Sequence, residues 1–182
     1  MKVMFVMLKT LGDVMLGTTL VREIMMDFPE SEIHFFTNKP YDEILENNPC
    51  ISEVHSSPDW DYNNLFLEMA SGKYDMVFAP YQVRRECNAW HQFEETRHQH
   101  LVDFYWARMG MHRMITEREC YLHPSEENFT KAGEHISMDV PRVAIHSTTG
   151  VKTKDWPLFA DLVEGLRKAG YGCVQVGARS DA

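Results

Sequence analysis

The sequence lacks long hydrophobic runs and is poor in basic residues, and each shortage excludes a class of protein. No run of roughly 18 or more apolar residues occurs, so the sequence predicts no membrane-spanning helix. Lysine and arginine together number 18 of the 182 residues, against 27 aspartates and glutamates. The resulting net charge of −9 disfavours nucleic acid as a partner, because phosphate binding requires a basic surface.

Closely spaced cysteines and glycine-rich nucleotide loops are also missing. The cysteines, at Cys50, Cys87, Cys120 and Cys173, form no Cys-x-x-Cys pair, which argues against a zinc knuckle. A chain of this size needs no disulfide framework, so we expect reduced thiols and a cytoplasmic location. Neither the Gly-x-Gly-x-x-Gly pattern nor the P-loop pattern is present. An ordinary NAD enzyme and a P-loop NTPase are therefore disfavoured.

What the sequence does contain is an alternation of short apolar strands and amphipathic helices. Residues 3–8 form a continuous apolar run typical of a buried parallel strand, and apolar residues spaced by three and four follow over 16–28. Further strands are predicted at 32–36, 51–55 and 74–79, and further helices at 41–45, 65–70 and 101–111. This order predicts an α/β fold with a doubly wound parallel sheet.

The chain is predicted to contain two domains. Residues 1–139 form the first, and about 116–139 is expected to be an irregular linker. Residues 140–182 begin a second domain with a strand at 142–146, a helix after Pro157 and a strand at 172–176. Two strands and one helix leave a sheet face and both edges uncovered, so this domain is predicted to be truncated. Pairing through 140–182, either in a homodimer or with a complementing chain, would cover this face and these edges.

Two polar segments follow predicted strands, at the carboxyl edge of a parallel sheet where ligands bind. In the first, Lys9–Asp13, the carboxylate of Asp13 stands at a strand-to-helix junction. There it can act as a general base toward a hydroxyl, or it can cap the helix, and spacing alone favours the cap. The second offers hydroxyls at 147–149 followed by Lys152 and Lys154. It suits a diphosphate site or a solvated turn.

A third candidate is the segment 84–113, which is rich in arginine and histidine. Its basic residues are Arg84, Arg85, Arg97, Arg108, Arg113, His91, His98, His100 and His112. They could face an anionic acceptor, or neighbouring acidic residues could neutralise a solvated face, and the sequence leaves both interpretations open. His98-x-His100 predicts no metal site, because helical residues at this spacing point about 200° apart.

The polar segments also carry a resemblance to a known family. The Leu-Gly-Asp-Val turn at 11–14, a helix ending in Phe-Pro at 28–29 and a strand opening with Glu-Ile at 32–33 resemble the start of the family 9 glycosyltransferases, the lipopolysaccharide heptosyltransferase type. YDMVFAP at 74–80 resembles a strand of that family, and HSTTGVKTKDWP at 146–157 resembles its nucleotide-sugar segment. The likeness extends over most of 1–80 and 142–177.

The resemblance implies a GT-B architecture of two facing Rossmann-like domains, with metal-independent, inverting transfer of a sugar such as a heptose. The implied site residues are Thr10, Gly12, Asp13, Thr148, Thr149 and Lys154. Asp13 would deprotonate the acceptor hydroxyl, beside a turn shaped by Thr10 and Gly12. Thr148, Thr149 and Lys154 would bind the diphosphate of the donor. No cofactor or metal is implied, and Asp59-Trp60-Asp61 matches a metal motif only in its letters, since it is expected in a turn before a helix.

The partners implied by the resemblance are a nucleotide-sugar donor and a glycan or lipopolysaccharide-core acceptor, with no nucleic acid and at most peripheral contact with a membrane. The family continues with a D-(T/S)-G-x-x-H segment that grips the donor, and this sequence contains none. The donor site is therefore predicted to be incomplete in this chain. The alternative is a non-catalytic module that binds a glycan or a partner. An unrelated nucleotide-binding protein with a Rossmann-like fold is the third hypothesis.

Overall fold

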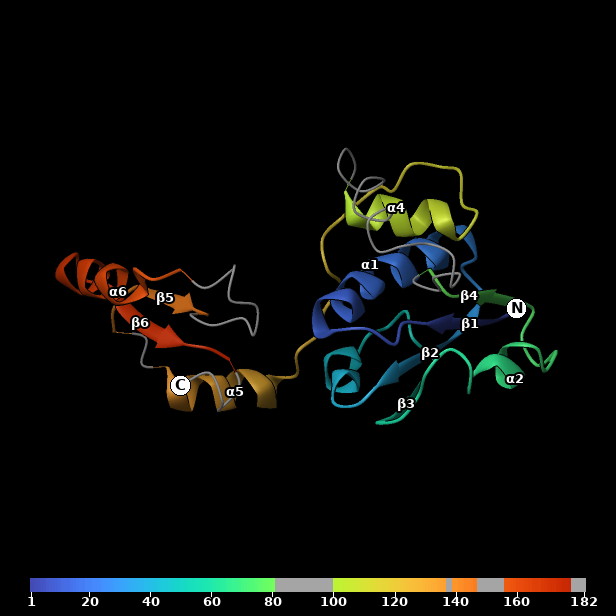
Figure 1. Cartoon of the computed structure of the whole chain (residues 1–182), viewed down its shortest axis with the longest axis horizontal. Coiled ribbons are helices and arrows are strands. Elements are labelled where there is room, and N and C mark those ends of the chain that lie inside the picture. Colours follow the sequence, from blue (N-terminus) through green and yellow to red (C-terminus); the bar gives the residue numbers. More distant parts are fainter. Residues whose placement is uncertain (81–99, 137–138, 147–155, 178–182) are drawn as a thin grey trace. The chain divides into compact units, whose positions relative to one another are not determined.

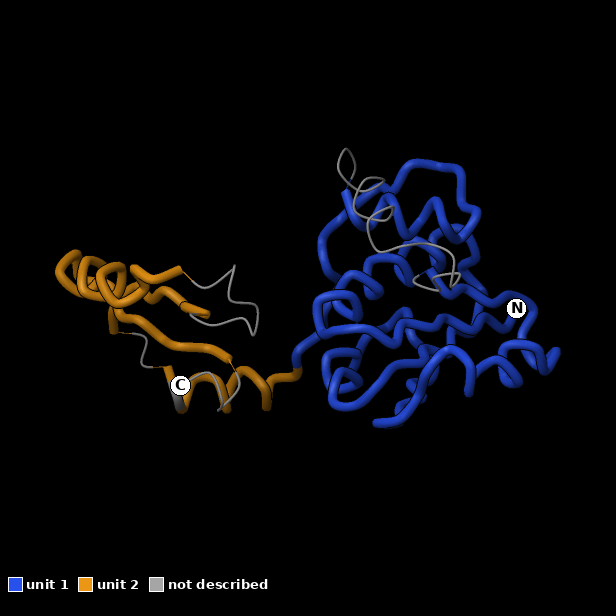
Figure 2. The backbone as a smooth tube through the Cα atoms, in the orientation of Figure 1, with its two compact units in different colours: residues 1–124 blue, residues 125–182 orange. Residues whose placement is uncertain are grey.

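A computed structural model of the chain shows two compact units, residues 1–124 and residues 125–182 (Figures 1 and 2). The residues that it describes are 1–80, 100–136, 139–146 and 156–177. The division between the units falls inside the segment 116–139 that the sequence suggested as a linker. None of the described helices is long and apolar enough to cross a lipid bilayer.

Unit 1 is built on a parallel sheet whose described strands lie in the order β3-β2-β1-β4. The strands are β1 (Lys2–Val6), β2 (Glu32–Asn38), β3 (Glu53–Ser57) and β4 (Met76–Phe78). The helices are α1 (Leu11–Asp27), the 3-10 helix η1 (Tyr41–Leu45), α2 (Phe66–Met69) and α4 (Leu101–Arg108). The alternation of strands and helices along the chain thus produces the parallel α/β sheet that it predicted (Figure 1).

The two faces of this sheet bury different side chains, because neighbouring residues of a strand point in opposite directions. Phe5 and Phe35 face α1, where a Cβ on Gly17 would lie only 3.0 Å from the Phe35 ring. Gly17 therefore lets the helix approach the sheet closely. Phe36, one residue later in β2, packs on the other face with Trp60, at 5.5 Å between ring centroids. Strand β1 is central, and its apolar side chains are buried on both faces.

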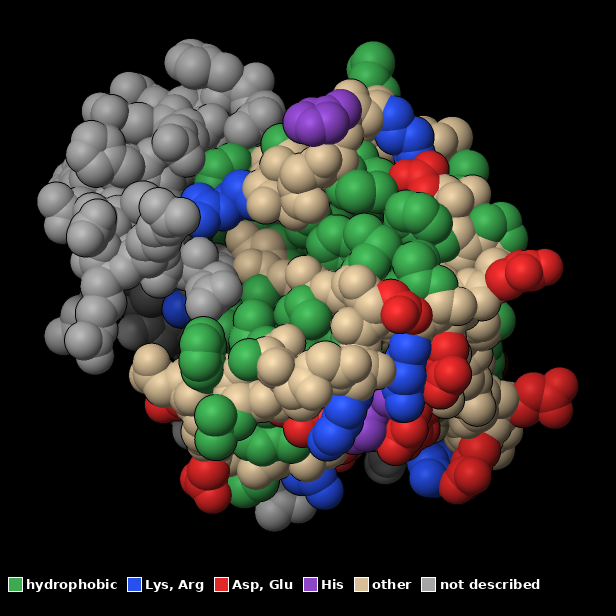
Figure 3. Space-filling view, turned by 90° about the vertical axis from the view of Figure 1, so that its right-hand side faces the viewer, with side chains coloured by type: hydrophobic (Ala, Val, Ile, Leu, Met, Phe, Trp, Pro, Cys, Tyr) green, Lys and Arg blue, Asp and Glu red, His purple; other side chains and the backbone are tan. Residues whose placement is uncertain are grey.

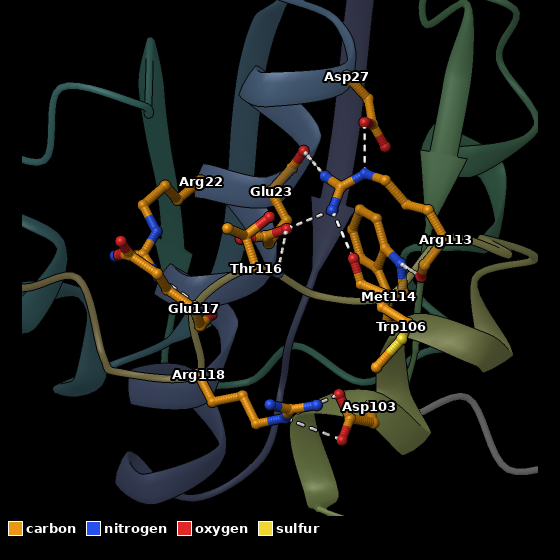
Figure 4. A network of polar contacts seen from close by, with 10 residues as sticks. All are labelled: Arg22, Glu23, Asp27, Asp103, Trp106, Arg113, Met114, Thr116, Glu117 and Arg118. Atoms are coloured by element: carbon orange, nitrogen blue, oxygen red, sulfur yellow. Dashed lines mark hydrogen bonds and ion pairs between the residues drawn. The ribbon is translucent and has the colours of Figure 1, made fainter.

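The segment after α4 is attached to α1 by a polar network (Figure 4). The guanidinium of Arg113 lies 2.6 Å from Glu23 Oε2 and 2.6 Å from Asp27 Oδ1, and its centre is 4.9 Å from that of the Trp106 ring. Glu23 is fully buried. Burial by itself would lower the pKa of Arg113, but hydrogen bonds to Asp27 and Glu23 raise it above its usual value. Arg113 therefore stays charged beside the two carboxylates.

Farther along, the same segment also satisfies polar groups of α1. The Thr19 hydroxyl donates to the Glu119 carbonyl at 2.8 Å, and the Thr18 hydroxyl accepts from the Tyr121 amide at 2.8 Å. Both threonines are fully buried. The Thr18 hydroxyl also donates to the Met15 carbonyl at 2.6 Å, whereas the Thr19 hydroxyl depends on Glu119 for its partner. Residues 116–121, although irregular as predicted, are thus held against the helix by specific contacts.

Unit 2 contains α5 (Glu126–His135), β5 (Arg142–Ile145), α6 (Phe159–Lys168) and β6 (Gly172–Gln175), with β5 and β6 paired in parallel. The prediction that 116–139 is irregular throughout is wrong at α5. The Ser125 hydroxyl oxygen caps this helix by accepting from the Asn128 amide at 3.1 Å, and Glu126 and Glu127 lie favourably in its first turn. Few apolar residues mark the helix, so hydrophobic periodicity did not reveal it.

A candidate active site at the start of helix α1

The carboxylate of Asp13 is held by two hydroxyl groups at the carboxyl edge of the sheet. Strand β1 ends at Val6, and α1 begins at Leu11, so Asp13 lies in the first turn of this 17-residue helix. The Thr10 hydroxyl donates to Asp13 Oδ2 at 2.8 Å, and the Tyr105 hydroxyl donates to Oδ1 at 2.7 Å. These two bonds fix the direction of the carboxylate, and its position in the first turn interacts favourably with the positive end of the helix dipole.

The geometry of α1 tests the helix-cap role considered for Asp13. Thr10 occupies the N-cap position of α1, with an extended backbone at φ −71° and ψ 165°. Asp13 comes three residues later, and its carboxylate accepts hydrogen bonds from hydroxyls of other residues. The cap interpretation, which spacing alone favoured, is therefore wrong in its strict form. The negative charge still interacts favourably with the helix dipole.

The surroundings of the carboxylate are open to solvent. Thr10, Leu11 and Gly12 are exposed, and Asp13 is half-buried. A Cβ at Gly12 would meet no atom within 4 Å, so neither packing nor a positive φ requires a glycine at this position. A side chain at position 12 would thus lie in open space beside the Asp13 turn. The three residues of the first predicted segment, Thr10, Gly12 and Asp13, are thus brought together.

Tyr105 is the member of this cluster that the sequence did not assign to the site. Its helix was predicted, and the spacing placed Tyr105 on an apolar face with Leu101 and Met109. The side chain is in fact 2% exposed, and α4 packs on α1, so that the ring reaches across to Asp13. A buried tyrosine requires a partner for its hydroxyl, and this requirement was the available signal. Only the fold shows that the partner is Asp13.

The second predicted segment lies outside the described residues. Thr148, Thr149 and Lys154, the expected diphosphate ligands, fall within 147–155, for which the structure provides no description. Arg84, Arg85, Arg97, His91 and His98 likewise fall within 81–99. The roles suggested for these residues stay predictions.

The described part of the segment 84–113 serves the structure at two positions. Arg113, whose side chain is 33% exposed, forms ion pairs with the fully buried Glu23 and the partly exposed Asp27, so its charge is offset within the unit. His100 is the N-cap of α4, where its Nδ1 accepts from the Val102 amide at 3.3 Å. His100 precedes Leu101, the first helical residue, in agreement with the predicted start of this helix.

The acidic segment Asp59-Trp60-Asp61 also has a structural role. Asp61 Oδ1 accepts from the backbone amides of Asn63 and Asn64, each at 2.8 Å. The carboxylate thus closes a turn that precedes α2, as the sequence predicted. An oxygen bound to two amides in this way is aimed at its own backbone and away from a ligand.

Comparison with known proteins identifies the fold. No protein-family model and no curated protein sequence matches the chain. The structure of a glycosyl transferase family 9 protein from Veillonella parvula aligns with 99% of the chain, with a TM-score of 0.72 at 19% identity. The ADP-heptose lipopolysaccharide heptosyltransferase II of E. coli covers all of it, with a TM-score of 0.70 at 16% identity.

A third likeness is to the E. coli heptosyltransferase WaaC solved with ADP-2-deoxy-2-fluoro heptose, with a TM-score of 0.58 at 14% identity over the whole chain. The chain spans 63%, 66% and 70% of the lengths of these three structures. The fold class expected from the sequence, a Rossmann-like α/β fold of the GT-B type, is confirmed by these likenesses. The chain therefore has the fold of the family 9 glycosyltransferases and heptosyltransferases over the length that it spans.

Proposed function

We propose that this chain is the acceptor-side domain and the beginning of the donor-side domain of a cytoplasmic, inverting glycosyltransferase. The proposed donor is a nucleotide-diphosphate sugar, with ADP-heptose as the first candidate, and the proposed acceptor is a glycan or lipopolysaccharide core. The observation that carries the proposal is the Asp13 carboxylate, which is bound by Thr10 and Tyr105 beside an open space at the start of α1. The likeness in fold to heptosyltransferases supports it.

In the proposed reaction Asp13 takes the proton of the acceptor hydroxyl. The acceptor oxygen forms a bond to the anomeric carbon as the bond from that carbon to the nucleotide diphosphate breaks on the opposite side. The configuration of the anomeric carbon is therefore inverted. Thr148, Thr149 and Lys154 are proposed to bind the departing diphosphate and offset its charge, so that the step requires no metal.

The position of Asp13 suits the role of base. Its two hydroxyl donors fix the direction of the carboxylate, and each oxygen retains a lone pair for a further hydrogen bond. An acceptor hydroxyl that enters beside Gly12 can donate to one of these lone pairs. Orientation before the reaction lowers the barrier, because the carboxylate does not have to be ordered in the transition state.

The experiment that tests the proposed function is a transfer assay with the anomeric configuration of the product as its readout. Because the donor site is expected to be incomplete, the chain is supplemented with a polypeptide that carries the missing D-(T/S)-G-x-x-H half of the donor domain. The mixture is incubated with ADP-heptose and a heptose-free lipopolysaccharide core, with and without EDTA, and the product is analysed by NMR. We expect a product of inverted configuration, formed at the same rate with EDTA. A product of retained configuration would contradict the mechanism. The absence of any transfer, with the acceptor still bound, would favour the alternative of a non-catalytic binding module.

A further inference from the structure

Two neighbouring strands of unit 1 carry the same Glu-x-His pattern. It occurs as Glu32-Ile33-His34 in β2 and as Glu53-Val54-His55 in β3. Residues two apart on a strand point to the same face, so each pattern places its carboxylate and imidazole on one side of the sheet. The strands pair in parallel with His34 opposite Glu53. This register brings the side chains of His34, Glu53 and His55 together.

The three side chains meet at distances close to those between the ligands of a bound metal ion. His34 Nδ1 lies 2.9 Å from His55 Nε2 and 3.3 Å from Glu53 Oε2. His55 Nε2 lies 3.5 Å from Glu53 Oε1. Around a tetrahedral zinc ion with bonds of about 2.0–2.1 Å, neighbouring ligand atoms are about 3.3–3.4 Å apart. The observed distances are within a few tenths of an ångström of that spacing.

The hydrogens available in this cluster do not satisfy its acceptors. His34 Nε2 lies 2.8 Å from Glu32 Oε1 and donates its hydrogen to that carboxylate. In the neutral ring, His34 Nδ1 then presents a lone pair to both His55 and Glu53. The Nε2 hydrogen of His55 can serve only one of these two acceptors well. A cation at the centre would interact favourably with all three groups.

Glu32 completes the pattern expected around a metal-binding histidine. Such a histidine usually donates its second ring N–H to a carboxylate, which fixes its orientation and raises its basicity. The Glu32–His34 contact has this geometry, and His34 itself is only 3% exposed. The amino group of Lys2 lies 3.9 Å from Glu32. Its positive charge offsets one of the two negative charges of Glu32 and Glu53, so one net negative charge remains.

We propose that His34, Glu53 and His55 bind a divalent transition-metal ion of the zinc or ferrous type, with Glu32 orienting His34. Two imidazoles and one carboxylate are a ligand set that both ions accept. Glu53 is exposed and His55 is partly exposed, with side chains 57% and 27% exposed, so a fourth ligand can enter from solvent. Figure 3 shows a histidine surrounded by acidic and basic side chains on the face of unit 1 that it displays.

This site is separate from the one at Asp13. Phe35 faces α1, so its neighbour His34 faces the opposite side of the sheet, where its ring lies 5.6 Å from that of Tyr74. The metal ion would join β2 to β3, which is at one end of the described strand order. Its proposed role is therefore to hold that strand in place, and the proposal does not depend on the reaction assigned to Asp13.

The experiment measures Zn²⁺ binding to the full chain after treatment with a chelator, by competition with a chromophoric chelator of known affinity. Two variants remove a ligand and preserve packing, Glu53→Gln and His55→Phe, the second retaining a ring that can stack on Phe36. We expect each to weaken zinc binding by at least a hundredfold, and Glu32→Gln to weaken it by about ten- to a hundredfold. Co²⁺ should produce visible absorption bands in the wild type that the ligand variants lack.

The controls are Glu46→Gln and His112→Ala, which change exposed residues of the same types outside the cluster. They should bind Zn²⁺ as the wild type does, and circular dichroism should show that every variant is folded. The proposal is wrong if the wild type binds no more tightly than the double variant Glu53→Gln/His55→Phe. That result would assign any residual zinc to other histidines of the chain.

Discussion

At the scale of single residues, the structure explains how a carboxylate near the surface is fixed in direction. Asp13 is half-buried, and its two oxygens are bound by hydroxyls from different parts of the chain, Thr10 three residues away and Tyr105 far along the sequence. The Tyr105 ring contributes to the core, and its hydroxyl contributes to the site. These two contributions can be separated by experiment.

Tyr105→Phe should retain the packing of the ring and remove only the bond to Asp13. Because solvent can reach the half-buried carboxylate, we expect the free energy of unfolding to fall by only about 1–2 kcal/mol. If Asp13 is the base, kcat should fall by about tenfold or more with little change in KM, since the carboxylate is less well oriented. Urea unfolding and steady-state kinetics measure the two effects. An unchanged kcat would remove Tyr105 from the site.

Gly12→Ala tests whether the open space beside Asp13 admits the acceptor. The new methyl group meets no protein atom, and alanine is the better helix former, so stability should rise by about 0.5–1 kcal/mol. Gly165→Ala in α6 is the matched control, because its Cβ also meets nothing within 4 Å. We expect transfer to fall only in Gly12→Ala, mainly through a higher KM for the acceptor. Equal transfer by both variants would place the acceptor elsewhere.

At the scale of elements, α1 is held from one side by the sheet and from another by the segment after α4. Glu23 carries this second attachment, because its fully buried carboxylate depends on Arg113 (Figure 4). The pair between Arg118 and Asp103 belongs to the same region but lies at the surface, with side chains 41% and 28% exposed. The two pairs should therefore differ widely in their energetic contribution.

Arg113→Met should lower the free energy of unfolding by about 3–5 kcal/mol, because it leaves the buried, charged Glu23 with no cation and only the Thr116 amide, at 3.3 Å, as a donor. Arg118→Met should lower it by less than about 1 kcal/mol, since water solvates the remaining Asp103. Chemical unfolding of the two variants under identical conditions makes the comparison. Similar losses in both would show that Glu23 is not stabilised chiefly by Arg113.

Elements whose signal is local could be predicted from the sequence, and contacts between distant elements could not. The apolar run of β1 and the three-and-four spacing of apolar residues in α1 follow from burial, so they are visible as local patterns in the sequence. The helix α5 was not predicted, because its polar sequence lacks that apolar periodicity. The bond from Tyr105 to Asp13 depends on the packing of α4, and the meeting of His34 with His55 depends on strand register. Neither packing nor register can be read from spacing within one segment.

At the scale of the whole molecule, the two units differ in how well they bury apolar side chains. Unit 1 contains two clusters of fully buried side chains around its sheet. In unit 2, large apolar side chains such as Phe129 and Leu158 are 66% and 48% exposed. A two-stranded sheet with few buried side chains is marginal by itself.

Residues 1–124 should therefore unfold cooperatively as a separate polypeptide, whereas residues 125–182 alone should not. Circular dichroism during urea titration of each fragment measures this, with the full chain as the reference. We expect a sigmoidal transition for the first fragment, close to the main transition of the full chain. A cooperative transition in the isolated second fragment would show that its elements form a sufficient core by themselves.

The measurement that tests the central claim most directly compares the transfer rates of wild-type protein and Asp13→Asn, each supplemented with the missing half of the donor domain. The substitution preserves the shape of the side chain, but the amide cannot accept the proton of the acceptor hydroxyl. With Asp59→Asn as the control, we expect Asp13→Asn alone to lower kcat by about 10²- to 10⁴-fold, with acceptor binding largely intact. Transfer at the wild-type rate by Asp13→Asn would contradict the assignment of Asp13 as the base.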